Sequence, residues 1–387
     1  MKPELEILLW AARRAMGAKE EFAPLAGRIT DWNAVIECAS ANSVIPLLAR
    51  SLAREAAVPL ASRRHLDKWY SLVAGTNAKL ARELDEVLRD LGREGIQAIA
   101  YKGPALAMLA YGDLTARNPS ADLDLLLHKR DITRAKEIVE ARGYRSVLTE
   151  EDEEHFFRYR YHFHFEDSAR GFQVELHWAL SPSYWRFPLD CWSRVRPVTV
   201  AGAEVPALDR ECSLLAVCAH GAKEGWPKLS QVLDVAQLVR APGLDWNWVF
   251  AETRRIRRER VLYLGLYLAS RRTGVALPDF IEAELARDPV LPELDAEIAS
   301  QFGRGYYEGG FRDFAVRVWH HPADRLRYLG YILLKFPDRL RHLARPSEED
   351  RKVGEWKPLQ VVARPFRAVY QRGWSRAVSN ARRTLWQ

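Results

Sequence analysis

The spacing of apolar residues changes along the chain, and this change constrains the fold more than any other feature. Residues 1–92 and 206–387 repeat their apolar positions with the helical period of about 3.6 residues. Between them, residues 93–205 contain short apolar runs bounded by glycine and segments that alternate apolar with polar residues, as strands do. We therefore predict an α+β protein: a small α/β core flanked by an N-terminal helical region and a C-terminal helical region with a basic tail.

The composition is typical of a globular protein. Hydrophobic residues make up 48% and charged residues 28% of the 387 residues, which allows a sizeable core. No apolar run approaches the roughly 20 residues of a membrane helix, and the N-terminal segment lacks the clean apolar block of a signal peptide. The four cysteines are scattered and lack zinc-finger spacing. We therefore expect a cytoplasmic protein with reduced thiols and no membrane span.

The net charge of +7 originates in the C-terminal segment. Residues 339–387 hold 12 Lys and Arg residues against 4 Asp and Glu residues, with aromatic residues between them. Such a mixture can bind a polyanion, so nucleic acid is a candidate partner of this segment. An amphipathic helical tail with a solvated cationic face has the same pattern, and we favour this second interpretation.

Two aspartates lie one residue apart on the predicted strand 122–127. Because side chains alternate along a strand, Asp122 and Asp124 point to one face and Leu123 to the other. Their α-carbons would lie about 6.5–7 Å apart, a spacing that lets both carboxylates converge on Mg²⁺, which prefers oxygen ligands. Solvent-exposed strand edges carry such pairs without any metal, so neighbouring residues must decide between the two interpretations.

Two neighbouring segments favour the metal site. Upstream, a predicted strand ends at Lys102 and Gly103, and the helix that follows would direct free backbone N–H groups at a phosphate. An ordinary strand-to-helix turn is the alternative there. Downstream, Glu175 lies on a strand whose other face is apolar, and a buried carboxylate is costly unless it is paired or binds a metal. Three acids on adjacent strands would bind two divalent ions, as in phosphoryl displacement.

A predicted hairpin brings histidines to the same place. If residues 168–171 form a four-residue loop, His164 pairs with Glu175 and His162 with His177, so the polar residues of both strands share one face. The three histidines are a candidate zinc site, because zinc accepts imidazole ligands. We prefer the interpretation that they line the carboxylate cleft, where they orient ligands or contact substrate.

Taken together, these segments resemble a known family. The stretch YKGPALAMLAYGDLTARNPSADLDLLL at 101–127, with GYRSV at 143–147 and VELHW at 174–178, is similar to the uncharacterised nucleotidyltransferase family of the DNA polymerase beta-like superfamily. The resemblance covers about residues 75–245 and implies a nucleotidyltransferase core of a mixed sheet with helices on it. In the downstream helices, it includes His220, Lys223, Trp226, Leu229 and Asp234.

The resemblance also implies roles for individual residues. Asp122, Asp124 and Glu175 match the metal-binding acids, and Gly103 matches the phosphate-facing glycine. Lys102 and Arg117 match family positions without settled roles; His177, His220 and Lys223 are further candidates for contact with the nucleotide or the acceptor. Two departures bear on the nucleotide pose. Pro104 replaces the serine that often follows the glycine, and Arg117 lies one residue further from Asp122 than expected.

The implied activity is the transfer of a nucleoside monophosphate from an NTP to a hydroxyl group of an acceptor, with Mg²⁺ or Mn²⁺ as the cofactor and Glu175 or His177 as the base. We expect the acceptor to be a small molecule or peptide, in natural-product or polysaccharide biosynthesis. A sugar-transferring enzyme, an enzyme that modifies RNA ends, and a non-catalytic binding or antitoxin-like protein with the same fold are the alternatives. The intact acids argue against the last of these.

Overall fold

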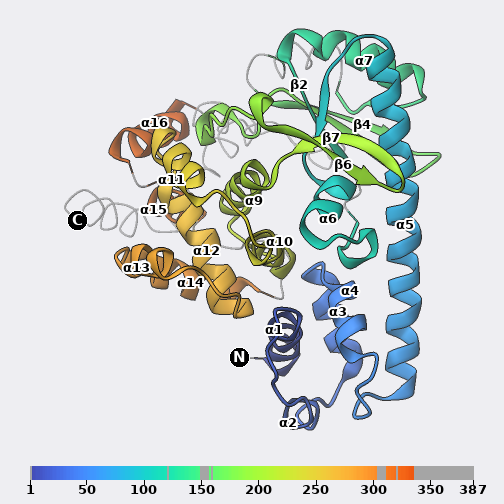
Figure 1. The fold of residues 1–387 in the computed structure, drawn as a ribbon, viewed down its shortest axis with the longest axis vertical. Coiled ribbons are helices and arrows are strands. Elements are labelled where there is room, and N and C mark those ends of the chain that lie inside the picture. Colours follow the sequence, from blue (N-terminus) through green and yellow to red (C-terminus); the bar gives the residue numbers. More distant parts are fainter. Residues whose placement is uncertain are drawn as a thin grey trace, which may run out of the picture. The chain divides into compact units, whose positions relative to one another are not determined.

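The computed structural model describes residues 2–119, 122–148, 157, 160–302, 311–319 and 321–334 (Figure 1). The chain divides into two compact units, residues 1–321 and residues 322–387. In the second unit the described part is helix α16 (Pro322–Leu334), so the predictions for the basic tail at 339–387 lie outside the described residues. Along the described ranges, none of the helices combines the length and the apolar composition needed to span a bilayer.

The N-terminal part of the first unit is helical, as the apolar period predicts. The helix α5 is 34 residues long; its first half packs against α3 and α4, and its last turns reach the sheet (Figure 1). It ends at Arg93, just after Gly92, where the period changes in the sequence. The helices are α1 (Pro3–Ala15), α2 (Ala23–Ala26), α3 (Trp32–Ala41), α4 (Ile45–Leu52) and α5 (Leu60–Arg93).

A seven-stranded mixed sheet follows, with the strand order β3-β4-β5-β2-β1-β7-β6. Strand β2 runs parallel to β5 and β1 runs parallel to β7, while the remaining neighbours are antiparallel. The expected α+β architecture with a small mixed sheet is therefore confirmed. The strands are β1 (Ala98–Ala100), β2 (Asp122–Leu127), β3 (Arg145–Ser146), β4 (His162–Asp167), β5 (Phe172–His177), β6 (Val195–Val200) and β7 (Ala203–Leu208).

The hairpin of β4 and β5 has the predicted register. His162 lies opposite His177, His164 opposite Glu175, and Asp167 opposite Phe172 at the turn. This register places the polar residues of both strands on one face and Phe163, Phe165, Val174 and Leu176 on the other, where they are buried.

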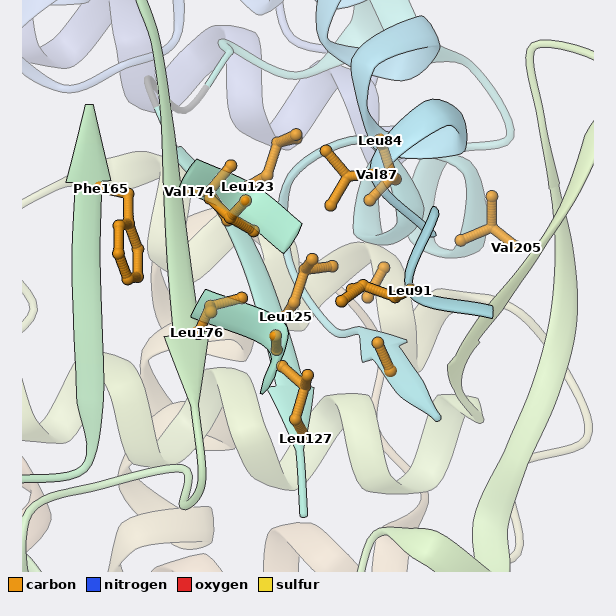
Figure 2. Packing of buried hydrophobic residues seen from close by; sticks show 14 of the residues in the cluster. Leu84, Val87, Leu91, Leu123, Leu125, Leu127, Phe165, Val174, Leu176 and Val205 are labelled. Atoms are coloured by element: carbon orange, nitrogen blue, oxygen red, sulfur yellow. The ribbon is translucent and has the colours of Figure 1, made fainter. Parts of the chain in front are cut away.

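The apolar face of the sheet packs against α5 and α7 (Ile132–Ala141). Leu84, Val87 and Leu91 of α5 meet the leucines of β2 and the apolar residues of β4 and β5 (Figure 2). Leu123 and Leu125 are almost fully buried, and each such side chain contributes roughly 1.5–3 kcal/mol when it leaves water. This burial holds β2 in the register that turns its aspartates to the opposite face.

The opposite face carries the site and packs against α9 (Arg210–Glu224). Ile99, Leu126 and Leu208 of the sheet form a small apolar cluster with Cys212 and Ala216 of α9. The other elements of the core are the helix α6 (Gly103–Tyr111) and the short helices η1 (Leu114–Ala116), η2 (Lys129–Asp131), η3 (Ser183–Trp185) and η4 (Trp192–Arg194).

The C-terminal part of the first unit is helical again. The junction of α9 and α10 is held by Trp226, which is fully buried and has a positive φ of 53°. A Cβ atom on Gly221 or Gly265 would collide with the Trp226 ring or the Cys218 sulfur, so both glycines allow this close packing. The helices are α9 (Arg210–Glu224), α10 (Leu229–Arg240), α11 (Trp246–Arg255), α12 (Glu259–Thr273), α13 (Asp279–Ala286), α14 (Val290–Gln301) and α15 (Phe311–Val318).

The predicted boundaries at 92/93 and 205/206 fall inside one compact unit. Strand β7 continues to Leu208, past the second boundary. The division into three regions stays a prediction about how the chain is organised.

Candidate active site

The three predicted acids lie together on the face of the sheet opposite the α5 core. Parallel pairing of β2 with β5 sets Asp124 directly beside Glu175, and the two-residue period places Asp122 on the same face. One carboxylate oxygen from each residue can be chosen so that all three lie within 4.8 Å of one another. The structure therefore brings together two acids from β2 and one from a strand about 50 residues further along the chain.

The two oxygens of Asp124 have different surroundings. The Nζ atom of Lys102 donates to Oδ1 at 2.7 Å, and the Nε2 atom of His177 lies 3.1 Å from the same oxygen. The other oxygen, Oδ2, is buried and has no hydrogen-bond partner within the described part of the chain. Because Asp124 is only 3% exposed, such an oxygen is costly unless a cation binds it. The Lys102 ion pair occupies one oxygen and leaves the other available.

The pKa values of the three acids differ because their neighbours differ. Burial and the adjacent Asp124 raise the pKa of Asp122 to about 6. Burial alone would raise the pKa of Asp124, but Lys102 and His177 have the larger effect and hold this pKa below its ordinary value. For Glu175, burial is outweighed by the hydrogen bond with His177, which lowers its pKa to about 2. At pH 7 all three groups are therefore mainly ionised, and Lys102 offsets only part of their charge.

Gly103 begins α6 beside the acids. The helix α6 starts at Gly103 itself, directly before Pro104, and Gly103 has a positive φ of 54°, a conformation that glycine adopts readily. A Cβ atom there would lie 3.8 Å from the backbone oxygen of Asp122, so the helix start and β2 approach closely. The first N–H groups of a helix have no partner within the helix, so this end of α6 can accept an anion.

Arg117 is held in a buried ion pair. Its Nε and Nη2 atoms donate to Asp234 of α10 at 2.9 and 3.0 Å, and the Tyr111 hydroxyl donates to the same carboxylate at 2.8 Å. Burial alone would lower the pKa of the Arg117 guanidinium, but the neighbouring Asp234 carboxylate has the larger effect and raises this pKa above its ordinary value. This pair joins the segment before β2 to α10. Nucleotide contact by Arg117 stays a prediction.

A cavity of about 240 Å³ adjoins the acids on the side of Lys102. Its walls come from the N-terminal helical part, the core and the helices α9 and α10. The Oδ1 atom of Asn118 is buried there without a hydrogen-bond partner in the described ranges. Sequence reasoning does not single out Asn118, since an isolated asparagine in a loop carries no pattern. The polar lining includes Ser43, Lys102, Arg117, Asn118, Asp122, His220, Glu224, Lys228, Gln231 and Asp234.

His220 and Lys223 of α9 lie in different surroundings. His220 lines the cavity, and its Nε2 atom is 3.3 Å from Glu224. Burial, together with Lys102 and Lys223, holds the pKa of His220 well below its usual value. The Nζ atom of Lys223 instead donates to the hydroxyl of Tyr161 at 3.1 Å, next to the start of β4.

Three histidines surround Glu175, as the hairpin register predicts. The Nε2 atom of His177 lies 2.9 Å from Oε2, while His162 and His164 approach Oε1 at 3.6 and 3.4 Å. The rings of His162 and His177 stack at a centroid distance of 4.8 Å. Burial and His177 lower the pKa of His162 to about 4, so this ring is neutral at pH 7.

A family model described as "uncharacterised nucleotidyltransferase" matches residues 29–274, which is more than half of the chain and includes every candidate residue named above. The chain belongs to this family. It is a nucleotidyltransferase with the α+β core that the resemblance implies.

Other comparisons add little to this assignment. No curated protein matches the nucleotidyltransferase significantly. The solution structure of the antibiotic-resistance factor ANT(2'')-Ia is similar over 59% of this chain and 95% of that chain, with a TM-score of 0.30 and 14% sequence identity. The family assignment rests on the family model, and the fold rests on the sheet and helices described above.

Proposed function

We propose that this nucleotidyltransferase moves a nucleoside monophosphate from an NTP to a hydroxyl group of an acceptor and uses Mg²⁺ held by Asp122, Asp124 and Glu175. One observation carries this proposal: the three carboxylates converge, and one buried oxygen of Asp124 has no partner in the described part of the chain. Mn²⁺ is the alternative ion, because it accepts the same oxygen ligands.

The donor set fits a divalent ion of this kind. All three ligands are carboxylates, and Lys102 and His177 hold Asp124 through Oδ1, so that Oδ2 keeps a defined direction. When bound, divalent ions at these acids would offset the charge of the triphosphate and lower the pKa of the acceptor hydroxyl.

The proposed reaction is an in-line displacement at the α-phosphorus. The acceptor oxygen forms a bond to this phosphorus, the bond to the bridging oxygen of the β-phosphate breaks, and pyrophosphate leaves. The proton of the hydroxyl passes to a base. Glu175 and His177 are the two candidates for this base, and the 2.9 Å contact between them means that a change in one alters the other.

The strand order suggests where each substrate binds. In the order β4-β5-β2-β1, the aspartates of β2 lie between Glu175 on one side and the Lys102–Gly103 segment after β1 on the other. The start of α6 would bind the β- and γ-phosphates, and Lys102 would offset their charge. The NTP would then occupy the cavity next to Lys102, and the acceptor would approach from the side of β4 and β5.

The acceptor hypothesis is a hydroxyl of a small molecule or peptide in natural-product or polysaccharide biosynthesis. An untargeted mass search tests it in cells that produce either the wild type or Asp124→Asn. We expect metabolites or peptides whose mass is raised by one nucleoside monophosphate in the wild type alone. Glu21→Gln, at an exposed position, is the control and should give the wild-type pattern.

A second measurement tests the chemistry in vitro. The purified chain is incubated with each α-³²P-labelled NTP, Mg²⁺ and the acceptor fraction found in cells. We expect transfer of the label, reduced by about 100-fold or more in Asp124→Asn, since the variant loses a charged ligand. Label transfer that survives in Asp124→Asn would contradict the metal role. Label on RNA alone would favour an RNA-modifying enzyme, and no transfer with any NTP would favour a binding protein.

A further inference from the structure

The β4–β5 hairpin places imidazole nitrogens around a single carboxylate. Glu175 has His177 next to Oε2 at 2.9 Å and His162 next to Oε1 at 3.6 Å, each through its Nε2 atom. The two imidazole rings stand 25° from parallel. The proposed magnesium site uses Glu175 but leaves His162 without a role.

We propose that His162, Glu175 and His177 form a second cation site that takes a borderline divalent transition ion, of the Co²⁺ or Zn²⁺ kind. One potential ligand atom from each of the three residues lies within 4.8 Å of the other two. This second site rests on the proposed function, because Glu175 belongs to both sites. Glu175 would connect the proposed Mg²⁺ site, which has oxygen ligands only, to a neighbouring site with imidazole ligands.

The distances suit ligands of one ion. Bonds of about 2.0–2.2 Å from nitrogen or oxygen to such an ion put neighbouring ligands roughly 3–3.5 Å apart, and opposite ligands no more than about 4.4 Å apart. The separations of 2.9 and 3.6 Å between the imidazole nitrogens and the Glu175 oxygens agree with this geometry.

Burial supports the same conclusion. His177 is 1% exposed, and the second ring nitrogen, Nδ1, of both His162 and His177 is buried without a hydrogen-bond partner among the described residues. In both rings the nitrogen that faces Glu175 is Nε2, so an ion bound there would take the place of the hydrogen on Nε2, and Nδ1 would carry the proton. At His177 the ion would also replace the contact between Nε2 and Oδ1 of Asp124, and Lys102 would then hold that oxygen alone.

The ligand chemistry separates the two sites. Asp122 and Asp124 supply only oxygen, which suits Mg²⁺, whereas two imidazoles with one carboxylate suit Zn²⁺ and its neighbours in the transition series. This site differs from the zinc site considered from the sequence, which consisted of His162, His164 and His177, because Glu175 replaces His164 as a ligand. His164 contacts Glu166 through its Nε2 atom at 3.1 Å and stands outside the group.

Titration of the metal-free, full-length protein with Co²⁺ tests this site, because Co²⁺ bound to nitrogen and oxygen ligands absorbs visible light. We expect a saturable absorption band that persists in millimolar Mg²⁺. His162→Ala should weaken Co²⁺ binding at least tenfold, as should His162→Gln, which keeps a polar side chain of similar size. His65→Ala, at a histidine whose ring contacts Trp69, is the matched control and should bind Co²⁺ like the wild type.

The opposite results are equally clear. If both His162 variants are folded by circular dichroism and bind Co²⁺ as the wild type does, the histidines only hold Glu175 through hydrogen bonds, and the second site does not exist. Absence of a Co²⁺ band in the wild type would overturn it too. Asp122→Asn separates this outcome from the proposed function: it should abolish Mg²⁺-dependent transfer while changing Co²⁺ affinity less than threefold. If the label is transferred but no Co²⁺ absorption band depends on His162, the proposed function is supported and the second cation site is rejected.

Discussion

The two carboxylate oxygens of Asp124 differ in their contacts: Oδ1 has hydrogen-bond partners, and Oδ2 has none among the described residues. Lys102 and His177 contact Oδ1, so the carboxylate is anchored and its pKa is kept low despite its burial. We propose that the other oxygen, Oδ2, which has no such partner among the described residues, binds a cation. Lys102 also limits the repulsion among the three acids in the absence of an ion, because it supplies a positive charge within hydrogen-bond distance of Asp124.

Removing the Lys102 charge should destabilise the metal-free protein. We expect Lys102→Met to lower the free energy of unfolding by about 2–4 kcal/mol, because the change leaves a buried carboxylate without its cation. Urea unfolding in EDTA measures the loss, and saturating Mg²⁺ should restore part of it. Lys102→Arg keeps the charge and should lose much less; equal losses in both variants would show that packing, not charge, is responsible.

The low pKa of His220 predicts a dependence of stability on pH. The folded protein keeps this ring neutral, whereas the unfolded chain takes up a proton below about pH 6.5. The unfolded state therefore binds more protons in acid, and stability falls as the pH drops below 6.5. From pH 7.5 to 5.5, the wild type should lose about 1 kcal/mol more than His220→Gln, as measured by urea unfolding. Equal losses would mean that His220 titrates normally.

At the scale of elements, the site depends on a strand end, a helix start and a parallel strand pair. The apolar face of β2 is locked against α5, which turns Asp122 and Asp124 toward the opposite face. The positive φ of Gly103 lets α6 begin next to the backbone of Asp122. Pairing of β2 with β5 then adds Glu175. Each element contributes through its backbone position, so the site should be sensitive to changes that move the backbone.

Gly103→Ala tests the helix start. Space is not the obstacle, since the nearest atom to a new Cβ lies 3.8 Å away, but the left-handed conformation costs an alanine about 1–2 kcal/mol. We expect a loss of stability of this size and a loss of nucleotidyl transfer, because α6 shifts relative to the aspartates. Gly75→Ala, in open space within α5, is the control and should stabilise the protein by roughly 0.5–1 kcal/mol. Equal behaviour of both variants would contradict a special role for Gly103.

At the scale of the whole first unit, the cavity is built from three parts of the chain. Ser43 comes from the N-terminal helices, Lys102 and Arg117 from the core, and His220 and Asp234 from α9 and α10. The buried pair of Arg117 and Asp234 joins two of these parts across 117 residues of sequence. An NTP in this cavity would contact all three parts and should reduce their local opening together.

Hydrogen exchange measures this coupling. With Mg²⁺ and the non-transferable analogue α,β-methylene-ATP, we expect slower exchange in residues 42–44, 102–106 and 228–234, the segments that contribute Ser43, Lys102 and Gln231 to the cavity lining. Helix α13 (Asp279–Ala286) contributes no residue to the cavity lining and should exchange at an unchanged rate. Protection confined to the β4–β5 hairpin would place the nucleotide on the other side of the acids and contradict the proposed pose.

Much of the site follows from local rules in the sequence. The two-residue period of a strand places Asp122 and Asp124 on one face, and the length of the loop at 168–171 sets His164 opposite Glu175. The apolar period and the position of glycine predict the end of α5 and the start of α6 closely. These features depend on neighbouring residues alone, so the sequence by itself determines them.

Tertiary structure decided how these pieces meet. The adjacency of Asp124 and Glu175 requires the parallel pairing of β2 with β5, and the partner of Arg117 comes from α10, far along the chain. The sequence contains all of these charged groups but does not show which of them will pair. Lys102 and Arg117 could each pair with several different acids, depending on how the chain folds. Only the packing of α5 on one face of the sheet and α9 on the other selects the partners, because burial makes an unpaired charge too costly to keep.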